Sequence, residues 1–126
     1  MNIDRLDHLV LTVADIGASI DFYVRVLGMR EETFREGRKA LTFGASKINL
    51  HEAGHEFEPK AHKPTPGSAD LCFVVTESIT DVAAELKDHG IAVEDGPVER
   101  TGARGSILSV YIRDPDNNLI ELSNYR

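Results

Sequence analysis

The chain has 126 residues, 41% of them hydrophobic and 28% charged, which is enough for one globular domain with its own core. A net charge of −7 without any Lys/Arg-rich run excludes nucleic acid and anionic membranes as expected partners. The single cysteine, Cys72, excludes an internal disulfide, and no uncharged apolar run approaches the roughly 20 residues of a membrane-spanning helix. Charged residues within the first thirty positions are unlike a secretory signal, so we expect a cytoplasmic location.

The first half of the chain predicts a strand, a helix and further strands. HLVLTV at residues 8–13 is apolar and rich in β-branched residues, as strands are. Four residues then recur at helical spacing before the stop signal Gly28: Ile20, Tyr23, Val24 and Leu27. Strand chemistry returns in residues 29–34 and 39–52, with glycine-containing turns at 36–38 and 44–46.

The second half follows the same plan after a connector. Residues 54–67 hold three prolines and two glycines and are expected to be extended. DLCFVV begins a strand at residue 70, and a helix is expected between the capping residue Ser78 and the stop signal Gly90. Residues 91–96 and 107–123 have strand character, with a turn at 114–118.

The two halves are an internal repeat. At an offset of 62 positions (70 − 8), His8 falls on Asp70 and Gly28 falls on Gly90 without a gap. We therefore predict an α+β fold of two tandem βαβββ modules, at about 4–53 and 68–125, within a single domain spanning 1–126. The modules are expected to form an open, mixed half-barrel sheet with helices on its outer face.

Side-chain alternation along the predicted strands places four polar residues on the face turned away from the helices: His8, His51, Asp70 and Glu121. Two imidazoles and two carboxylates on one surface indicate a divalent-metal site. The other connector histidines, His55 and His62, have no strand to orient them and are expected to be solvated.

Four basic residues are candidates for binding an anionic substrate: Lys39, Lys47, Arg100 and Arg104. The segment ERTGARGS, residues 99–106, has the composition of a flexible loop that could close over the site.

The repeated plan, the first-strand His8 and the segment RDPDNNLIELS at 113–123 resemble the vicinal oxygen chelate superfamily, which includes glyoxalase I, extradiol dioxygenases, methylmalonyl-CoA epimerase and fosfomycin-resistance proteins. KINLHE, PTPGSADLCF and GPVERTGA are similar to segments of virulence-type or lactoylglutathione-lyase-like bacterial members. The resemblance implies that His8 and Glu121 bind metal. His51 then matches a position where relatives have Glu or Gln, and Asp70 stands where metal-dependent members have a second histidine.

The leading functional prediction is a glyoxalase-like lyase or isomerase that uses one divalent ion (Zn, Ni, Mn, Co or Fe) to stabilise an enediolate. Glu121 would also be the catalytic residue that moves the proton. The alternatives are a non-haem Fe(II) ring-cleaving dioxygenase and a non-catalytic, drug- or metabolite-binding resistance protein. A small-molecule substrate and a homodimer are expected, with modules pairing within one chain or between two.

Overall fold

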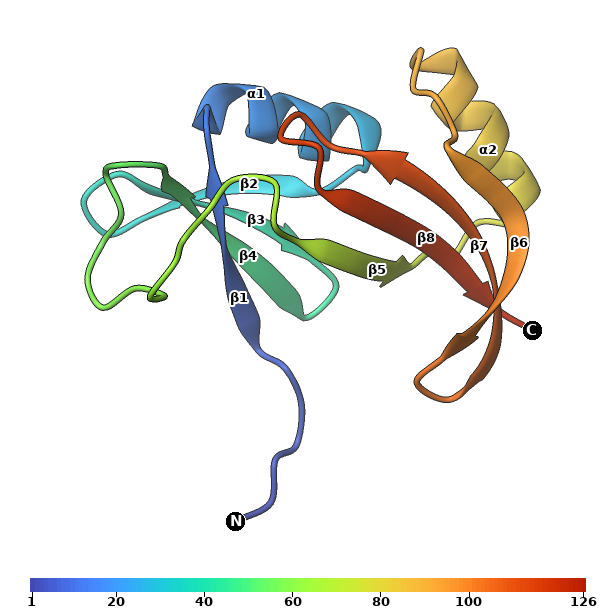
Figure 1. The fold of residues 1–126 in the computed structure, drawn as a ribbon, viewed down its shortest axis with the longest axis horizontal. Helices are drawn as coiled ribbons and strands as arrows, with labels where there is room; N and C mark the ends of the chain where they lie inside the picture. Colours follow the sequence, from blue (N-terminus) through green and yellow to red (C-terminus); the bar gives the residue numbers. More distant parts are fainter. The chain divides into compact units, whose positions relative to one another are not determined.

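The computed structural model describes all 126 residues, which fall into two units, Met1–Gly67 and Ser68–Arg126. Unit 1 contains β1 (His8–Val13), α1 (Ile16–Asp21), η1 (Phe22–Val26), β2 (Arg30–Phe34), β3 (Arg38–Phe43) and β4 (Ser46–Glu52) (Figure 1). Its sheet has the order β1-β4-β3-β2, with β1 parallel to β4 and the other neighbours antiparallel.

The apolar face of this sheet is the core of unit 1. Val13, Leu41, Ile48 and Leu50 are at most 1% exposed, as the alternation along their strands predicts. Asp15 caps α1, because its carboxylate accepts a hydrogen bond of 3.1 Å from the Ala18 backbone N–H.

The predicted first helix does not stay α-helical to its end. From Phe22 it widens into the π-helical turn η1, in which the Leu27 N–H donates to the Phe22 carbonyl over 3.4 Å. The wider turn leaves Phe22, Tyr23 and Val26 all buried. Gly28, at φ 72°, then ends the helix as predicted.

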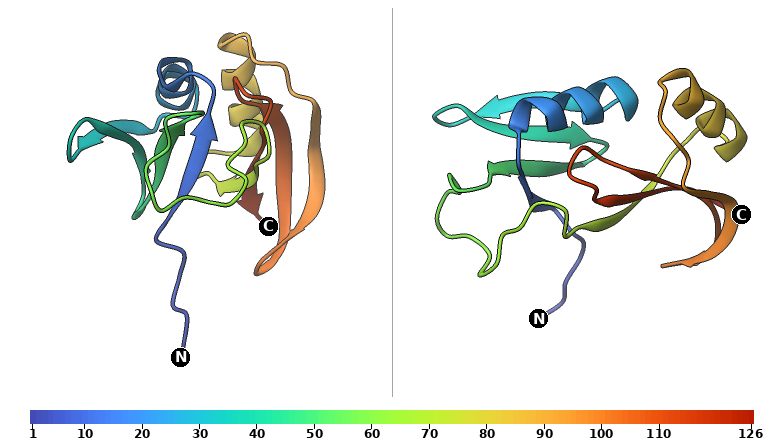
Figure 2. Two further views of the ribbon diagram at one scale, coloured as in Figure 1. Left: turned by 60° about the vertical axis from the view of Figure 1, so that its left-hand side comes forward. Right: turned by 45° about the horizontal axis from the view of Figure 1, so that its top comes forward.

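Unit 2 repeats this order with β5 (Asp70–Val74), α2 (Ile79–Asp88), β6 (Asp95–Gly102), β7 (Gly105–Arg113) and β8 (Leu119–Tyr125). Its sheet has the order β5-β8-β7-β6, with β5 parallel to β8. The α2 helix packs against this sheet (Figure 2) and buries Ile79, Val82 and Leu86. The Ser78 hydroxyl caps α2 by accepting from the Asp81 N–H at 3.2 Å.

Two expectations about the second strand of unit 2, β6, were wrong. The strand begins at Asp95 instead of near Ile91, and ERTGARGS is not a flexible loop. Its first four residues belong to β6, its last two begin β7, and Gly102 pairs with Gly105 across a tight turn. These residues have the composition of a loop, but they form strands here because β6 and β7 supply each other with backbone hydrogen-bond partners.

The predicted α+β class with two βαβββ modules is confirmed. Neither helix of the structure has the length and apolar character required to cross a membrane.

Candidate functional site

His8 begins β1 on the face of the sheet opposite the helix. Its Nδ1 lies 2.8 Å from Asp7 Oδ2, and its side chain is 43% exposed. The hydrogen bond to His8 lowers the pKa of Asp7, so this carboxylate is ionised at neutral pH. A carboxylate on Nδ1 fixes the ring so that Nε2 faces outward, which is the usual arrangement of a metal-binding histidine.

His51 is on the same face of the sheet, but at a different position along the strands. In the parallel β1–β4 pair, His8 is opposite Lys47, whereas His51 is opposite Thr12. His8 and His51 are therefore four residues apart along the strands, a separation of roughly 13 Å. Each imidazole nitrogen must lie about 2 Å from a shared ion, and two rings that stand up from the sheet at this separation cannot both reach it. The geometry of unit 1 therefore does not support His8 and His51 as joint ligands of one ion.

The strand register identifies Asn49 as the residue that sequence reasoning missed. Asn49 is opposite Val10, and Glu121 is opposite Cys72, the residue 62 positions after Val10. Asn49 is thus the repeat equivalent of Glu121. His51, by the same register, is equivalent to Ser123.

The signal for Asn49 was present in the sequence, because Ile48-Asn49-Leu50 aligns with Ile120-Glu121-Leu122. Side-chain alternation alone does not reveal it, because Asn49 and His51 are on the same face of the strand. The Asn49 Oδ1 atom is buried and accepts no hydrogen bond from the protein.

Glu121 lies on the equivalent face of unit 2 and is held by hydroxyl groups. The Ser109 hydroxyl donates to Glu121 Oε2 over 2.6 Å, and the Ser123 hydroxyl lies 3.4 Å from the same oxygen. Ser109 and Ser123 are fully buried and also contact each other at 2.7 Å. Asp70 is one strand away on the same face and diagonal to Glu121, since it pairs with Leu119.

Tyr111 and Arg100 extend this polar cluster. Tyr111 is directly opposite Glu121 in the β7–β8 register, and its hydroxyl accepts from Arg100 Nε at 3.1 Å. Arg100 also contacts Asp95 at 3.3 Å. Burial, followed by the nearby Glu121 carboxylate, raises the pKa of Tyr111, so the phenol keeps its proton at neutral pH.

The four predicted substrate-binding cations do not share one environment. Lys39 pairs with Leu50 in the sheet register, so it lies on the helix face, where it forms a 2.8 Å ion pair with Glu31. Lys47 lies on the open face of unit 1 with its ammonium 4.3 Å from the Phe34 ring centre. Arg104 is in the β6–β7 turn, stacked 5.2 Å from the Tyr125 ring centre. Lys39 is thus turned away from the face that carries His8.

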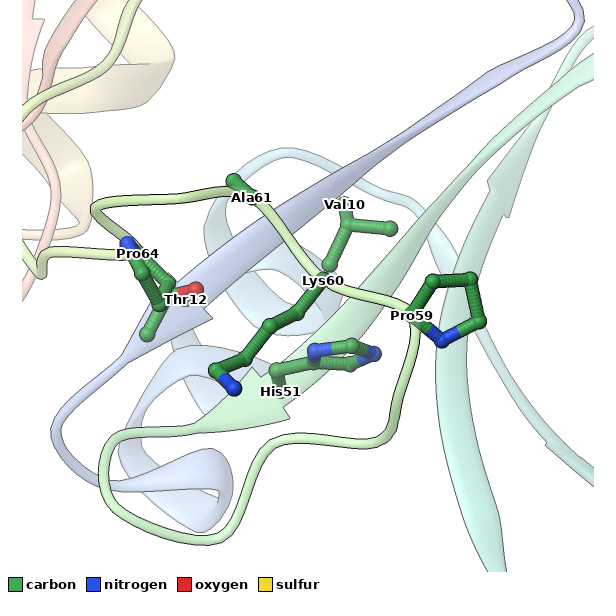
Figure 3. A pocket seen from close by; sticks show the side chains of 7 residues that line it. All are labelled: Val10, Thr12, His51, Pro59, Lys60, Ala61 and Pro64. Carbon is green, nitrogen blue, oxygen red and sulfur yellow. The ribbon is translucent and has the colours of Figure 1, made fainter.

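A hollow of about 380 Å³ lies on the open face of unit 1, between the sheet and the connector (Figure 3). It is lined by Val10, Thr12, His51, Pro59, Lys60, Ala61 and Pro64. His51 is 8% exposed, and its ring edge meets Phe57 at 5.5 Å between ring centres. Burial, followed by the nearby Arg38 charge, lowers the pKa of His51 from its usual 6.5, so the ring is neutral at neutral pH.

The predicted ligands thus occur as one pair in each unit, His8 with His51 and Asp70 with Glu121. The structure has no group of three His, Cys, Asp or Glu side chains placed to hold a metal ion. His8, oriented by Asp7, and Glu121, oriented by Ser109, nevertheless have the character expected of metal ligands.

Comparison with known proteins gives a consistent family. The Glyoxalase/Bleomycin resistance protein/Dioxygenase superfamily matches residues 5–122. Virulence protein STM3117 of Salmonella typhimurium is 62% identical over 99% of this chain and 87% of its own. Its crystal structure covers the whole chain with a TM-score of 0.99.

Other relatives are named for a glyoxalase domain or for an enzyme. The glyoxalase domain-containing protein RDO1 of Mycosarcoma maydis is 60% identical over 100% of this chain and 71% of its own. A metapyrocatechase of Geobacillus stearothermophilus is 31% identical over 94% of this chain and 36% of its own. A lactoylglutathione lyase of Neisseria meningitidis is 26% identical over 93% of this chain and 88% of its own.

Proposed function

Because the chain belongs to the Glyoxalase/Bleomycin resistance protein/Dioxygenase superfamily, we propose that it is a metal-dependent, glyoxalase-like lyase or isomerase acting on a small molecule. The residues that we propose as metal ligands are His8 in unit 1, and Asp70 and Glu121 in unit 2. His51, the fourth predicted ligand, is the one that the strand register sets apart from His8.

The observation that carries the proposal is the way the two central donors are oriented. Asp7 holds the His8 ring through Nδ1, and Ser109 donates to one Glu121 oxygen at 2.6 Å. Such outer partners fix the direction and raise the basicity of metal ligands. The Asp7–His8 contact adds little to folding, since both residues are exposed at the start of an edge strand.

The residues around Glu121 suit proton transfer at its carboxylate. Glu121 would take a proton from a carbon next to a substrate oxygen and return it to the neighbouring carbon. Ser109 and Ser123 keep the carboxylate in position, and Tyr111, protonated and backed by Arg100, is a hydrogen-bond donor beside it. A bound divalent ion would supply Lewis-acid stabilisation of the negative charge that develops on the substrate oxygen.

Metal titration of four variants tests the ligand set. Isothermal titration of the chelator-treated protein with Zn²⁺, Ni²⁺ and Mn²⁺ should give one ion per chain. His8→Ala and Glu121→Gln should each weaken binding about 100-fold or more, because each removes a direct ligand.

His62→Ala is the matched control, since His62 is an exposed connector histidine. His51→Ala is the fourth variant, and a loss of binding equal to that of His8→Ala would restore His51 to the ligand set. Unchanged affinity in both His8→Ala and Glu121→Gln would contradict the proposal.

A ring-cleaving Fe(II) dioxygenase is the second candidate, favoured by the identity to a metapyrocatechase and by the mixed histidine and carboxylate donors. Hemithioacetals and catechols should be offered to the metal-loaded protein in parallel. Product formation from a hemithioacetal without oxygen uptake supports the lyase. Oxygen consumption with catechol and Fe(II) would replace it by the dioxygenase.

A further inference from the structure

The hollow on unit 1 has walls from the sheet and from the connector. Val10, Thr12 and His51 rise from β1 and β4, whereas Pro59, Lys60, Ala61 and Pro64 belong to the connector (Figure 3). A volume of about 380 Å³ is within the range of small-molecule sites. The connector therefore forms one wall of a cavity that is large enough for a small molecule.

The lining of this hollow is mostly apolar. Val10, Pro59, Ala61 and Pro64 present only hydrocarbon, and Val10 is 48% exposed on the open sheet face. Covering an aliphatic side chain this exposed with a ligand is favourable, because it removes apolar area from water. An apolar body is thus the part of a ligand that these walls fit.

The polar lining has one charge, and that charge is positive. Thr12 supplies a hydroxyl, His51 supplies a neutral ring, and Lys60 supplies an ammonium, while no carboxylate lines the hollow. Lys60 also pairs with Glu58, whose side chain is 71% exposed, on the connector, and Glu56 is a second acidic neighbour of the ammonium. Exposed pairs of this kind contribute little, so an anion inside the hollow can compete for the ammonium.

We propose that this hollow binds a small, largely apolar molecule with a single anionic group, and that Lys60 pairs with that group. Thr12 and His51 offer hydrogen bonds to uncharged polar atoms of the same ligand. The inference depends on unit 1 alone and does not require the metal site. If the proposed enzyme function holds, the hollow would take the part of the substrate that lies beyond His8, two residues from Val10 on the same face.

Two naphthalene dyes of similar size separate the role of charge from that of shape. 8-Anilinonaphthalene-1-sulfonate carries one sulfonate, and N-phenyl-1-naphthylamine carries none. Titration of the chelator-treated protein, followed by dye fluorescence, should show that both dyes bind. Lys60→Gln should weaken binding of the sulfonate dye about tenfold and leave the neutral dye within twofold.

Lys63→Gln is the matched control, because it removes the same charge from the same connector outside the hollow. Ala61→Trp should weaken both dyes by filling the cavity, and Ala61 is exposed enough to accept the larger ring. Circular dichroism of each variant confirms that it is folded.

Equal losses in Lys60→Gln and Lys63→Gln, or full binding of both dyes to Ala61→Trp, would overturn the proposal. Metal titration of Lys60→Gln separates it from the proposed function, since metal affinity should be unchanged whatever the dyes do.

Discussion

His51 is the residue whose surroundings differ most from the sequence expectation. It is a neutral, nearly buried ring that forms the floor of the hollow, between β4 and the connector. Burial lowers its pKa in the folded protein below the usual 6.5. Above that pH both the folded and unfolded chains hold the neutral ring, so His51 has no effect on stability there.

This pKa predicts how stability changes with pH. Below about pH 6.5 the unfolded chain protonates His51 and the folded chain does not, so the free energy of unfolding should fall as the pH drops towards the folded pKa. The slope from this group is limited to about 1.4 kcal/mol per pH unit. Urea unfolding of chelator-treated protein between pH 7.5 and 5.5 measures it. His51→Gln should flatten the curve in that window, and an identical slope in the variant would contradict the lowered pKa.

The Asp7–His8 contact makes a second prediction at this scale. Asp7→Asn keeps the shape of the side chain but removes the charge that orients the ring. Metal affinity should therefore fall about 10- to 100-fold, with the stability of the fold unchanged because both residues are exposed. Asp4→Asn is the control, since Asp4 pairs with Arg5 and does not contact His8. Equal affinity in both variants would show that Asp7 does not orient the ligand.

The faces of individual residues were predictable where strand and apolar pattern coincide. His8 is on the other face of β1 from the buried Leu11. Glu121 is on the other face of β8 from the buried Ile120 and Leu122, as side-chain alternation predicts. The level of a residue along its strand was not predictable in the same way. Alternation alone does not separate Asn49, which pairs with Val10, from His51, which pairs with Thr12. The alignment of Ile48-Asn49-Leu50 with Ile120-Glu121-Leu122 does separate them, and the register agrees with it.

At the scale of elements, the β6–β7 hairpin was not predicted from the composition of its residues. Its glycines and charged residues are typical of a loop. Residues 98–102 of β6 nevertheless pair with residues 105–109 of β7, because the chain reverses tightly between them and β7 is a long strand with buried side chains. The hairpin is part of the reason that Glu121 lies farther from Asp70 in sequence than the equivalent Asn49 does from His8. β6 and β7 have 8 and 9 residues where β2 and β3 have 5 and 6, and the connections before β6 and β8 are also longer than those before β2 and β4.

Gly96, beside the β6 bulge, gives a prediction for this hairpin. It has φ 99°, and a Cβ there would overlap the Ser109 carbonyl oxygen and the Val110 backbone. Gly96→Ala should lower the free energy of unfolding by about 1–3 kcal/mol more than Gly44→Ala does. Gly44 also has positive φ, at 51°, but faces open space, so its substitution should cost only the backbone term of about 1–2 kcal/mol. Urea denaturation compares them, and equal costs would show that the backbone contact at Gly96 is absent.

At the scale of the whole molecule, the repeat predicted the order of all eight strands and both helices, because both modules have the same strand, helix and turn signals. Sequence could not predict the hollow on unit 1. Its walls depend on how the proline-rich connector folds back over β1 and β4, and such a segment has no periodic pattern from which its path can be derived.

The last prediction concerns assembly. β1 and β5 are edge strands of their sheets, and the open face of each carries an exposed valine, Val10 at 48% and Val74 at 62%. Unpaired edges and exposed apolar side chains favour association with a second chain. We therefore expect sedimentation equilibrium at micromolar concentration to give twice the mass of one chain.

Val74→Glu should shift the equilibrium towards monomer by placing a charge on that face. Val24→Glu should not, since Val24 is exposed on the helical side of unit 1. A wild-type protein that sediments as a single chain would exclude the homodimer.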